Sequence, residues 1–112
     1  MFKLVRSSDT TSRNHNGSYT ITNYLTKEFS KDFSIAVSKM TNGNHELTRS
    51  VTSDRIYYFI EAQAEFVIGN ETLAIRGDDV LFIEKNTDYS FSGTFKAVLI
   101  NLPAFRIEDD RK

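Results

Sequence analysis

The 112-residue sequence contains no cysteine, no tryptophan and one proline. Without cysteine, the chain can form no disulfide, cannot use a thiol in catalysis and cannot bind zinc through cysteine. The 14 basic and 15 acidic residues give a formal charge of −1. Non-specific nucleic-acid binding needs a surplus of Lys and Arg, so we expect no nucleic-acid partner.

Long apolar runs are also missing. The first ten residues, MFKLVRSSDT, do not have the apolar core of a signal peptide or of a membrane span. We therefore expect no membrane partner and a cytoplasmic location. Hydrophobic residues make up 39% and charged residues 26%, which is typical of a globular protein. A chain of this length predicts one domain, residues 1–112.

Aromatic residues are well represented, with nine Phe and five Tyr. Aromatic and β-branched side chains favour strands, and no segment keeps a helical period over eleven or more residues. Residues 6–18 are expected to form a polar loop, 41–46 a turn and 104–112 a charged C-terminal tail. Strands are predicted at 1–5, 19–26, 33–40, 55–61, 64–69, 72–75, 80–83, 89–91 and 96–102. This pattern predicts an all-β sandwich or barrel.

The order of strands and turns over residues 40 to 102 resembles the cupin superfamily, whose members are small jelly-roll barrels. The first cupin motif, counted from Gly43, places its metal-binding positions at Arg49, Val51 and Arg55, with its final glycine at Ala62. In the second motif, the turn begins at Gly77. The remaining positions of that motif are occupied by Glu84 (Pro in the family), Asn86 (Gly), Tyr89 (the metal-binding His) and Gly93 (Asn). The resemblance implies a double-stranded β-helix fold.

The residues at the metal-binding positions do not suit a metal. Cupin sites use three His and one Glu, whereas this chain has two histidines in all, His15 and His45. A guanidinium has no lone pair to donate, and a neutral phenol is a poor ligand. We therefore expect no transition-metal site and no cofactor.

Inward-facing and outward-facing side chains alternate along barrel strands. This alternation predicts which side chains occupy the place of the metal. The expected ligand-binding residues are Arg49, Arg55, Tyr57, Phe59, Tyr89 and Phe91. Such a cavity suits a small anion, such as a carboxylate or a sugar phosphate, since Arg binds both in a bidentate way. The alternative is that the arginines point outward or form ion pairs, because a one-residue slip exchanges the two faces. Phe59, Phe66, Phe82 and Phe91 are most simply interpreted as core residues.

The leading hypothesis is thus a metal-free cupin that binds a small polar or anionic molecule. One alternative is a metal-independent sugar isomerase or epimerase that uses Tyr89 as acid and His45 as base. The other is a sensor or dimerisation scaffold without catalysis. The resemblance implies a homodimer, and the apolar segment 1–5 could add to the partner's sheet as an exchanged edge strand.

Overall fold

The computed structural model describes residues 1–15, 17–106 and 110–111. This part of the chain contains one short 3-10 turn, η1 (Ser7–Asp9), and is otherwise built from strands. The strands are β1 (Thr11–His15), β2 (Tyr19–Leu25), β3 (Ser34–Ser50), β4 (Asp54–Ile68), β5 (Glu71–Arg76), β6 (Val80–Ile83), β7 (Tyr89–Leu102) and β8 (Asp110–Arg111). No helix of the described residues is long and apolar enough to cross a membrane. The all-β prediction is confirmed.

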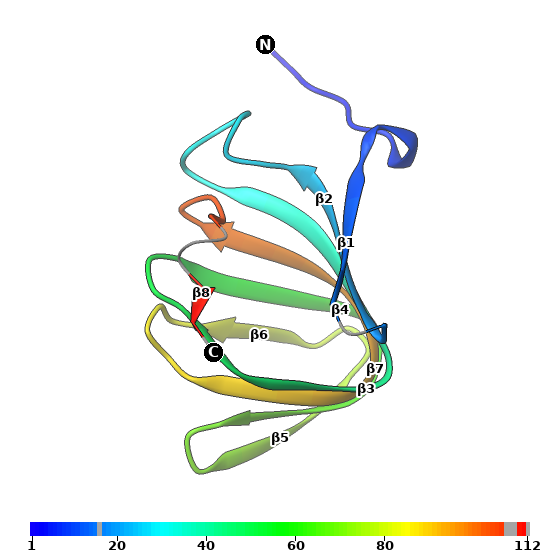
Figure 1. Ribbon diagram of the computed structural model, residues 1–112, viewed down its shortest axis with the longest axis vertical. Helices are drawn as coiled ribbons and strands as arrows, with labels where there is room; N and C mark the ends of the chain where they lie inside the picture. The colour runs from blue at the N-terminus through cyan, green and yellow to red at the C-terminus, as the bar shows by residue number, and fades with distance from the viewer. Residues whose placement is uncertain (16, 107–109, 112) are drawn as a thin grey trace.

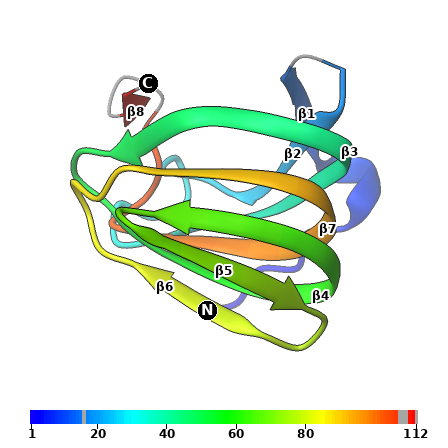
Figure 2. The same cartoon turned by 90° about the horizontal axis from the view of Figure 1, so that it is seen from below.

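The strands belong to one antiparallel sheet in the order β1-β2-β3-β7-β4-β5, with β6 paired to β4 and β8 paired to β3. Strands β3, β4 and β7 are 17, 15 and 14 residues long. Figure 1 shows these strands bending, so that the two halves of the sheet face each other across the interior, and Figure 2 shows the same curvature from below. The result is a rolled sheet that is open at one side.

Irregularities in the pairing allow the long strands to bend. On β3 the register shifts between Met40 and Gly43, and on β4 it shifts between Phe59 and Glu61. An extra residue in one strand increases its local bend and twist. Segment 41–46, expected as a turn, is therefore part of β3: its Asn and Gly residues form a bulge rather than a chain reversal.

Two other segments also differ from expectation. Residues 6–18, expected to form a polar loop, contain η1 and strand β1, which pairs with β2. The expected strand at 1–5 is not formed, and Met1, Phe2 and Leu4 are exposed. In the expected tail, Asp110 and Arg111 form β8 beside β3, while 107–109 and 112 lie outside the described residues. Propensity alone did not reveal β1, because its residues have no apolar alternation.

The core is an aromatic cluster between the two halves of the sheet. Its largest fully buried side chains include Tyr57, Tyr89, Phe59, Phe66 and Phe95. Many of these rings make edge-to-face contacts, such as Phe59 with Phe66 at 5.4 Å between centroids, an arrangement that aromatic quadrupoles favour.

Phe66 and Phe82, both expected in the core, lie in different surroundings. Phe66 lies in the core as expected, but Phe82 does not, because it points to the outer side of β6 and is 56% exposed.

Small side chains line the inner side of β3. Its buried positions alternate from Ser34 through Ala36 and Ser38, whereas the larger Ile35 and Val37 are only partly buried. Since alternate residues of a strand face opposite sides, the bulky residues point outward here. The small inward residues leave room in this part of the barrel for a pocket.

Candidate functional site

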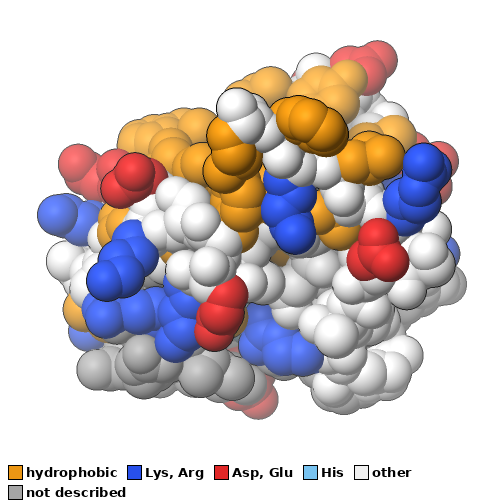
Figure 3. Space-filling model, turned by 90° about the horizontal axis from the view of Figure 1, so that it is seen from above, with side chains coloured by type: hydrophobic (Ala, Val, Ile, Leu, Met, Phe, Trp, Pro, Cys, Tyr) orange, Lys and Arg blue, Asp and Glu red, His pale blue; other side chains and the backbone are white. Residues whose placement is uncertain are grey.

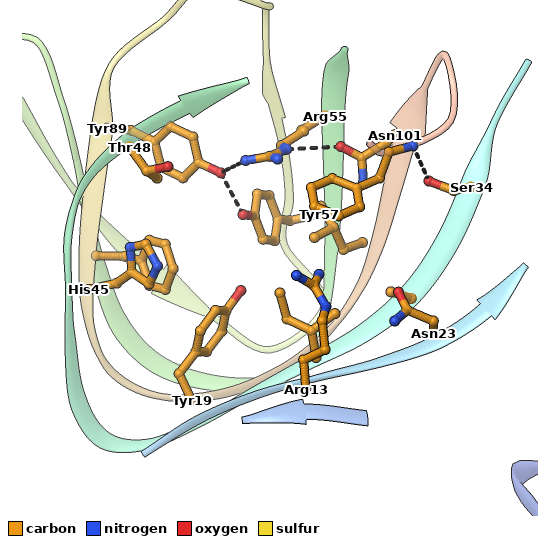
Figure 4. A pocket seen from close by; sticks show the side chains of 15 residues that line it. Arg13, Tyr19, Asn23, Ser34, His45, Thr48, Arg55, Tyr57, Tyr89 and Asn101 are labelled. Atoms are coloured by element: carbon orange, nitrogen blue, oxygen red, sulfur yellow. Dashed lines mark hydrogen bonds between the residues drawn. The ribbon is translucent and has the colours of Figure 1, made fainter. Parts of the chain in front are cut away.

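A pocket opens between the strands on this side of the barrel (Figure 4). Its empty volume is about 590 Å³, including space that is open to solvent. Five strands and the segment after β7 supply its walls. The lining residues are Arg13, Tyr19, Ile21, Asn23, Ser34, Ala36, His45, Thr48, Arg55, Tyr57, Tyr89, Phe91, Leu99, Asn101 and Phe105. None of these lining side chains is acidic, and two are arginines.

Arg55 is the centre of a hydrogen-bond network in the pocket wall. It is 5% exposed and lies on β4. Its Nε donates to Asn101 Oδ1 at 2.8 Å, and its Nη1 donates to Tyr89 Oη at 2.8 Å. Both acceptors come from β7, the neighbouring strand, where Asn101 is the register partner of Arg55. The guanidinium is therefore held in a fixed orientation inside the barrel.

The two buried tyrosines extend this network. Tyr57 Oη lies 2.8 Å from Tyr89 Oη, and either hydroxyl can donate. Burial away from water raises the pKa of the Tyr57 phenol well above its ordinary value, and the nearby Tyr89 and Tyr19 raise it further against an opposing effect of Arg55. Tyr57 therefore keeps its proton and can donate to Tyr89. In that arrangement the Tyr89 oxygen accepts from both neighbours, and its own proton can be directed into the pocket.

A second arginine approaches the same region from the other side of the pocket. The guanidinium carbon of Arg13, on β1, lies 4.9 Å from the centre of the Phe105 ring, and that of Arg55 lies 6.0 Å from it. The backbone N–H of Phe105 donates to Ser34 Oγ at 2.8 Å, which fixes this aromatic residue at the pocket wall. Two permanent positive charges thus come close to one ring.

His45 lies on the wall opposite to Asn101, beside Phe91 and Tyr19 (Figure 4). Its ring stacks on Phe91 with 4.7 Å between centroids and packs edge-on against Tyr19 at 5.3 Å. Its Nδ1 lies 2.9 Å from the Glu46 carbonyl oxygen. A carbonyl can only accept, so Nδ1 carries the hydrogen, and in neutral imidazole the lone pair is on Nε2. With Nδ1 as the donor to Glu46, Nε2 is the basic nitrogen of the neutral ring.

The structure places four of the six expected ligand-binding residues in the pocket: Arg55, Tyr57, Tyr89 and Phe91. Both expected catalytic residues, Tyr89 and His45, also line it. Two expected residues lie elsewhere. Phe59 is fully buried in the core. Arg49 points outward, where its Nε lies 3.6 Å from Asp88 Oδ1 and its side chain is 43% exposed.

A second register shift on β3 explains the position of Arg49. The shift lies between His45 and Thr48, so that Thr48 turns into the barrel and its neighbour Arg49 turns out. A one-residue irregularity exchanges the two faces of a strand from that point on. The same strand therefore supplies His45 and Thr48 to the pocket but not the arginine.

Several lining residues were not expected from the sequence. Tyr19 and Asn23 share the inner face of β2, which its alternation could have indicated. Asn101 is a lone polar residue within an apolar strand, which is also a usable indication of a buried hydrogen bond. No pattern points to Arg13 or Phe105, since both lie in segments that are expected to be loop or tail.

The residues at the cupin metal positions do not fit a metal ion. Arg49 is outside the pocket, and Arg55 and Tyr89 are hydrogen-bonded to each other. Among the described residues, no group of three His, Asp or Glu side chains lies close enough together to hold a metal ion.

Comparison with solved structures shows the fold. Pac13, described as a nucleoside dehydratase, superposes with a TM-score of 0.88 at 20% identity, over 99% of this chain and 90% of the other. Variants of the Streptomyces protein with a Tyr-to-Phe or His-to-Gln substitution were solved with uridine.

Two further structures share the architecture. KdgF from Halomonas superposes with a TM-score of 0.81 at 10% identity, over 96% and 98% of the two chains. The cupin domain of Schizosaccharomyces pombe Cnp3 gives 0.69 at 12% identity, over 76% and 64%. The expected jelly-roll barrel of the cupin type is confirmed.

Comparison by sequence gives a family. Residues 3–105 match the model of a family described as ethanolamine utilisation protein EutQ. No curated protein matches the chain.

Proposed function

The chain belongs to the EutQ family, and we propose that its barrel binds a small organic molecule with an anionic group, such as a carboxylate or a phosphate. The observation that carries this proposal is the approach of Arg13 and Arg55 to the same pocket wall. Arg is well suited to both anions because its planar donors match two oxygens at once. Because Arg55 is almost fully buried, water screens its charge less than it would screen a charge at the surface, which strengthens the attraction of an anion to the pocket.

The remaining lining residues support a sugar-like or nucleoside-like body for this ligand. Tyr19, Asn23 and Thr48 add hydroxyl and amide groups that can pair with ligand hydroxyls, and the Phe91 and Phe105 rings offer flat apolar surface. A few polar groups within a largely apolar wall are typical of small-molecule sites. The uridine seen with the structurally similar dehydratase has this combination of polar ring and sugar.

The family name mentions ethanolamine, whose amine is protonated at neutral pH. A cation would meet repulsion from Arg13 and Arg55, so we expect ethanolamine itself to bind poorly in this pocket. Ethanolamine is therefore a useful negative control in a ligand panel.

A thermal-shift screen followed by calorimetry tests the proposal. The panel contains small carboxylates, sugar phosphates, nucleotides, their uncharged parents and ethanolamine. We expect anionic members to raise the melting temperature, since a ligand that binds only the folded state stabilises it. Arg13→Gln and Arg55→Gln should each weaken binding about 10- to 100-fold, because a charge-assisted hydrogen bond contributes roughly 1.5–3 kcal/mol.

Arg49→Gln is the matched control, since Arg49 is an exposed arginine outside the pocket. It should leave the affinity unchanged. The proposal is wrong if no anion in the panel binds, or if Arg49→Gln lowers the affinity as much as Arg13→Gln does.

A second candidate function is acid–base catalysis on such a ligand without a metal, as in an isomerase, an epimerase or a dehydratase. It is favoured by the presence of His45 and Tyr89 in the same pocket. His45 Nε2 would accept a proton from a carbon or oxygen of the ligand. Tyr89 would deliver a proton to the departing or rearranging oxygen, while Arg55 and Tyr57 stabilise the charge left on its own oxygen.

Substitution separates binding from catalysis. Once a ligand is known, Tyr89→Phe and His45→Gln should retain binding within about tenfold and lower turnover by about 10²- to 10⁴-fold. Tyr58→Phe is the control because this tyrosine, on the neighbouring strand β4, points outward, where its hydroxyl donates to Asp78 Oδ1. Turnover that survives both pocket substitutions would exclude this mechanism. The pocket lined by Arg55 and Tyr89 offers a ligand a place to bind, which a role as scaffold alone does not require.

A further inference from the structure

A second groove lies outside the barrel pocket, between the loop that joins β2 to β3 and the segment that follows β7. Its empty volume is about 740 Å³, including space that is open to solvent. Among the described residues, it is lined by Lys27, Lys31, Pro103, Ala104 and Arg106, none of which lines the barrel pocket. Lysine and arginine side chains make up most of this lining, so we call it the basic groove.

The loop presents its two lysines on one side. The backbone N–H groups of Phe29 and Ser30 donate to the Thr26 carbonyl oxygen, at 2.9 and 3.2 Å. These bonds make residues 26–30 an α-turn. Residues four apart are neighbours on such a turn, and Lys27 and Lys31 accordingly line the same groove.

The acidic residues of the loop are placed differently. Glu28 and Asp32 each follow a lysine by one position, and neither is among the described residues that line the groove. The Glu28 carboxylate accepts a hydrogen bond from Thr26 Oγ1 at 3.2 Å. The loop therefore contributes its cations to the groove but not its acids.

The opposite wall of the groove is fixed to the loop and to β3. The backbone N–H of Ala104 donates to the Lys31 carbonyl oxygen at 3.1 Å. The backbone N–H of Phe105 donates to Ser34 Oγ at 2.8 Å. Because side chains alternate along an extended segment, Ala104 and Arg106 face the groove, whereas Phe105 lines the barrel pocket. The two sites thus lie on opposite sides of one segment.

The charges of the groove favour an anionic ligand. Neither Lys27 nor Lys31 forms an ion pair with another of the described residues. Like charges four residues apart on a turn repel each other, and Arg106 adds a third positive charge. Figure 3 shows Lys and Arg side chains gathered toward the lower left of the face seen from above. A bound anion would relieve the repulsion between the two lysines.

We propose that the basic groove is a second anion site, for a small ligand that carries a diphosphate or a longer chain of phosphates. A single carboxylate would pair with one cation at a time, and water and salt screen such a pair in an open groove. A chain of phosphates offers charged oxygens to all three cations at once. Lysine binds phosphate as a point charge and arginine binds it through two parallel donors.

The groove recognises the phosphates and not the molecule that carries them. No aromatic side chain is among its described lining residues, so a base or a sugar ring has no flat surface on which to stack. This lining differs from that of the barrel pocket, where Tyr19, Phe91 and Phe105 provide such surfaces. Inorganic pyrophosphate is therefore a sufficient probe of the groove.

An NMR titration of the ¹⁵N-labelled chain with inorganic pyrophosphate tests the proposal. We expect the amide signals of residues 27–31 and 104–106 to shift and to saturate, with a dissociation constant of roughly 10 µM to 1 mM. Orthophosphate should bind at least about tenfold more weakly, because it engages fewer of the cations. The absence of shifts in these two segments up to about 10 mM pyrophosphate would overturn the proposal.

The double variant Lys27→Gln/Lys31→Gln removes two of the three charges. It should weaken pyrophosphate binding about tenfold, since each exposed ion pair contributes a few-fold in affinity. Both lysines are exposed, so the fold should be retained.

Lys39→Gln/Lys96→Gln is the matched control. These two lysines are exposed register partners on β3 and β7, outside the groove. The change in net charge is the same, but the affinity should stay within about threefold. Equal losses in the two double variants would mean that pyrophosphate responds only to net charge, and would overturn the proposal.

Arg13→Gln separates the groove from the barrel pocket, which pyrophosphate can also enter. If the groove is a site, the shifts at 27–31 and 104–106 persist in Arg13→Gln and weaken in Lys27→Gln/Lys31→Gln. The opposite result would place the phosphate in the barrel pocket alone. It would overturn the second site and leave the function proposed for the barrel intact.

Discussion

Arg55 brings a charge into the barrel that no change of pH within the stable range can remove. Guanidinium groups stay protonated in proteins, and this one is held by Asn101 and Tyr89. The region around it is therefore electropositive whether or not His45 is protonated. Binding of an anion should accordingly vary little with pH, whereas any turnover that depends on His45 should vary with the protonation of that ring.

Tyr57 leads to a prediction at alkaline pH. Burial raises the pKa of its phenol well above the ordinary value, so the folded state holds this proton more tightly than the unfolded state does. The associated stability is complete below the unfolded-state pKa of about 10 and is lost as the pH rises through the folded-state pKa. We expect a steep fall in the free energy of unfolding above about pH 10.

The Tyr57→Phe variant isolates this contribution. Loss of the hydrogen bond to Tyr89 should cost about 1 kcal/mol near neutral pH, but the alkaline fall in stability should become shallower than in the wild type. Urea unfolding followed by circular dichroism at several pH values measures both effects. An unchanged alkaline slope in Tyr57→Phe would show that another group causes it.

At the scale of single elements, β3 shows what alternation predicts and where it fails. Inward and outward positions alternate regularly from Ser34 to Met40. Two shifts of register then follow, and they carry His45 into the pocket and Arg49 out of it. A period of two cannot locate such shifts, because the bulge depends on backbone geometry at Asn42, which has a φ of 45°. By contrast, β4 is regular through Arg55 and Tyr57, and both side chains point into the barrel, as alternation predicts.

Gly93 gives a prediction for strand β7. Its φ is +111°, and a Cβ at this position would lie 2.6 Å from the Gln63 carbonyl oxygen and 2.8 Å from Ala64 Cα. Both contacts are with the backbone of β4, which cannot move without breaking the pairing of the two strands. Gly93→Ala should therefore destabilise the fold by about 2–4 kcal/mol, from backbone strain and overpacking together.

Gly77→Ala is the control for this substitution. Gly77 lies in the turn before β6, and a Cβ there would meet only ordinary contacts, the nearest being the Ile60 carbonyl oxygen at 3.4 Å. Its effect should stay within about 1 kcal/mol. Thermal unfolding should separate the two variants by roughly 10 °C, and similar melting temperatures would refute the argument from close packing.

At the scale of the whole molecule, the order of turns was enough to predict a rolled β-sheet but not the length of its strands. Asn and Gly usually mark a chain reversal and so predict a break between 33–40 and 41–46, although here they lie within one bent strand. Only some of the residues that line the pocket can be predicted from the alternation along the strands. Residues from β4 and β7 follow a regular alternation, whereas Arg13 and Phe105 enter the site only through the closure of the barrel.

This closure also determines which part of the pocket can move. The central strands β3, β7 and β4 are each paired on both sides, while β1 is at the edge of the sheet and pairs only with β2 within the described residues. Local opening is easiest where few contacts hold an element. Hydrogen–deuterium exchange should therefore be fastest in β1 and slowest in β7.

Because Arg13 lies on β1, an anion bound between Arg13 and Arg55 would tie this edge strand to the centre of the sheet. A bound ligand should then slow exchange in β1 more than in β5, which is also an edge strand but contributes nothing to the pocket. Arg13→Gln should remove this selective protection even at ligand concentrations that saturate the variant. Equal protection of β1 and β5 would mean that the ligand stabilises the barrel as a whole, without a specific contact from Arg13.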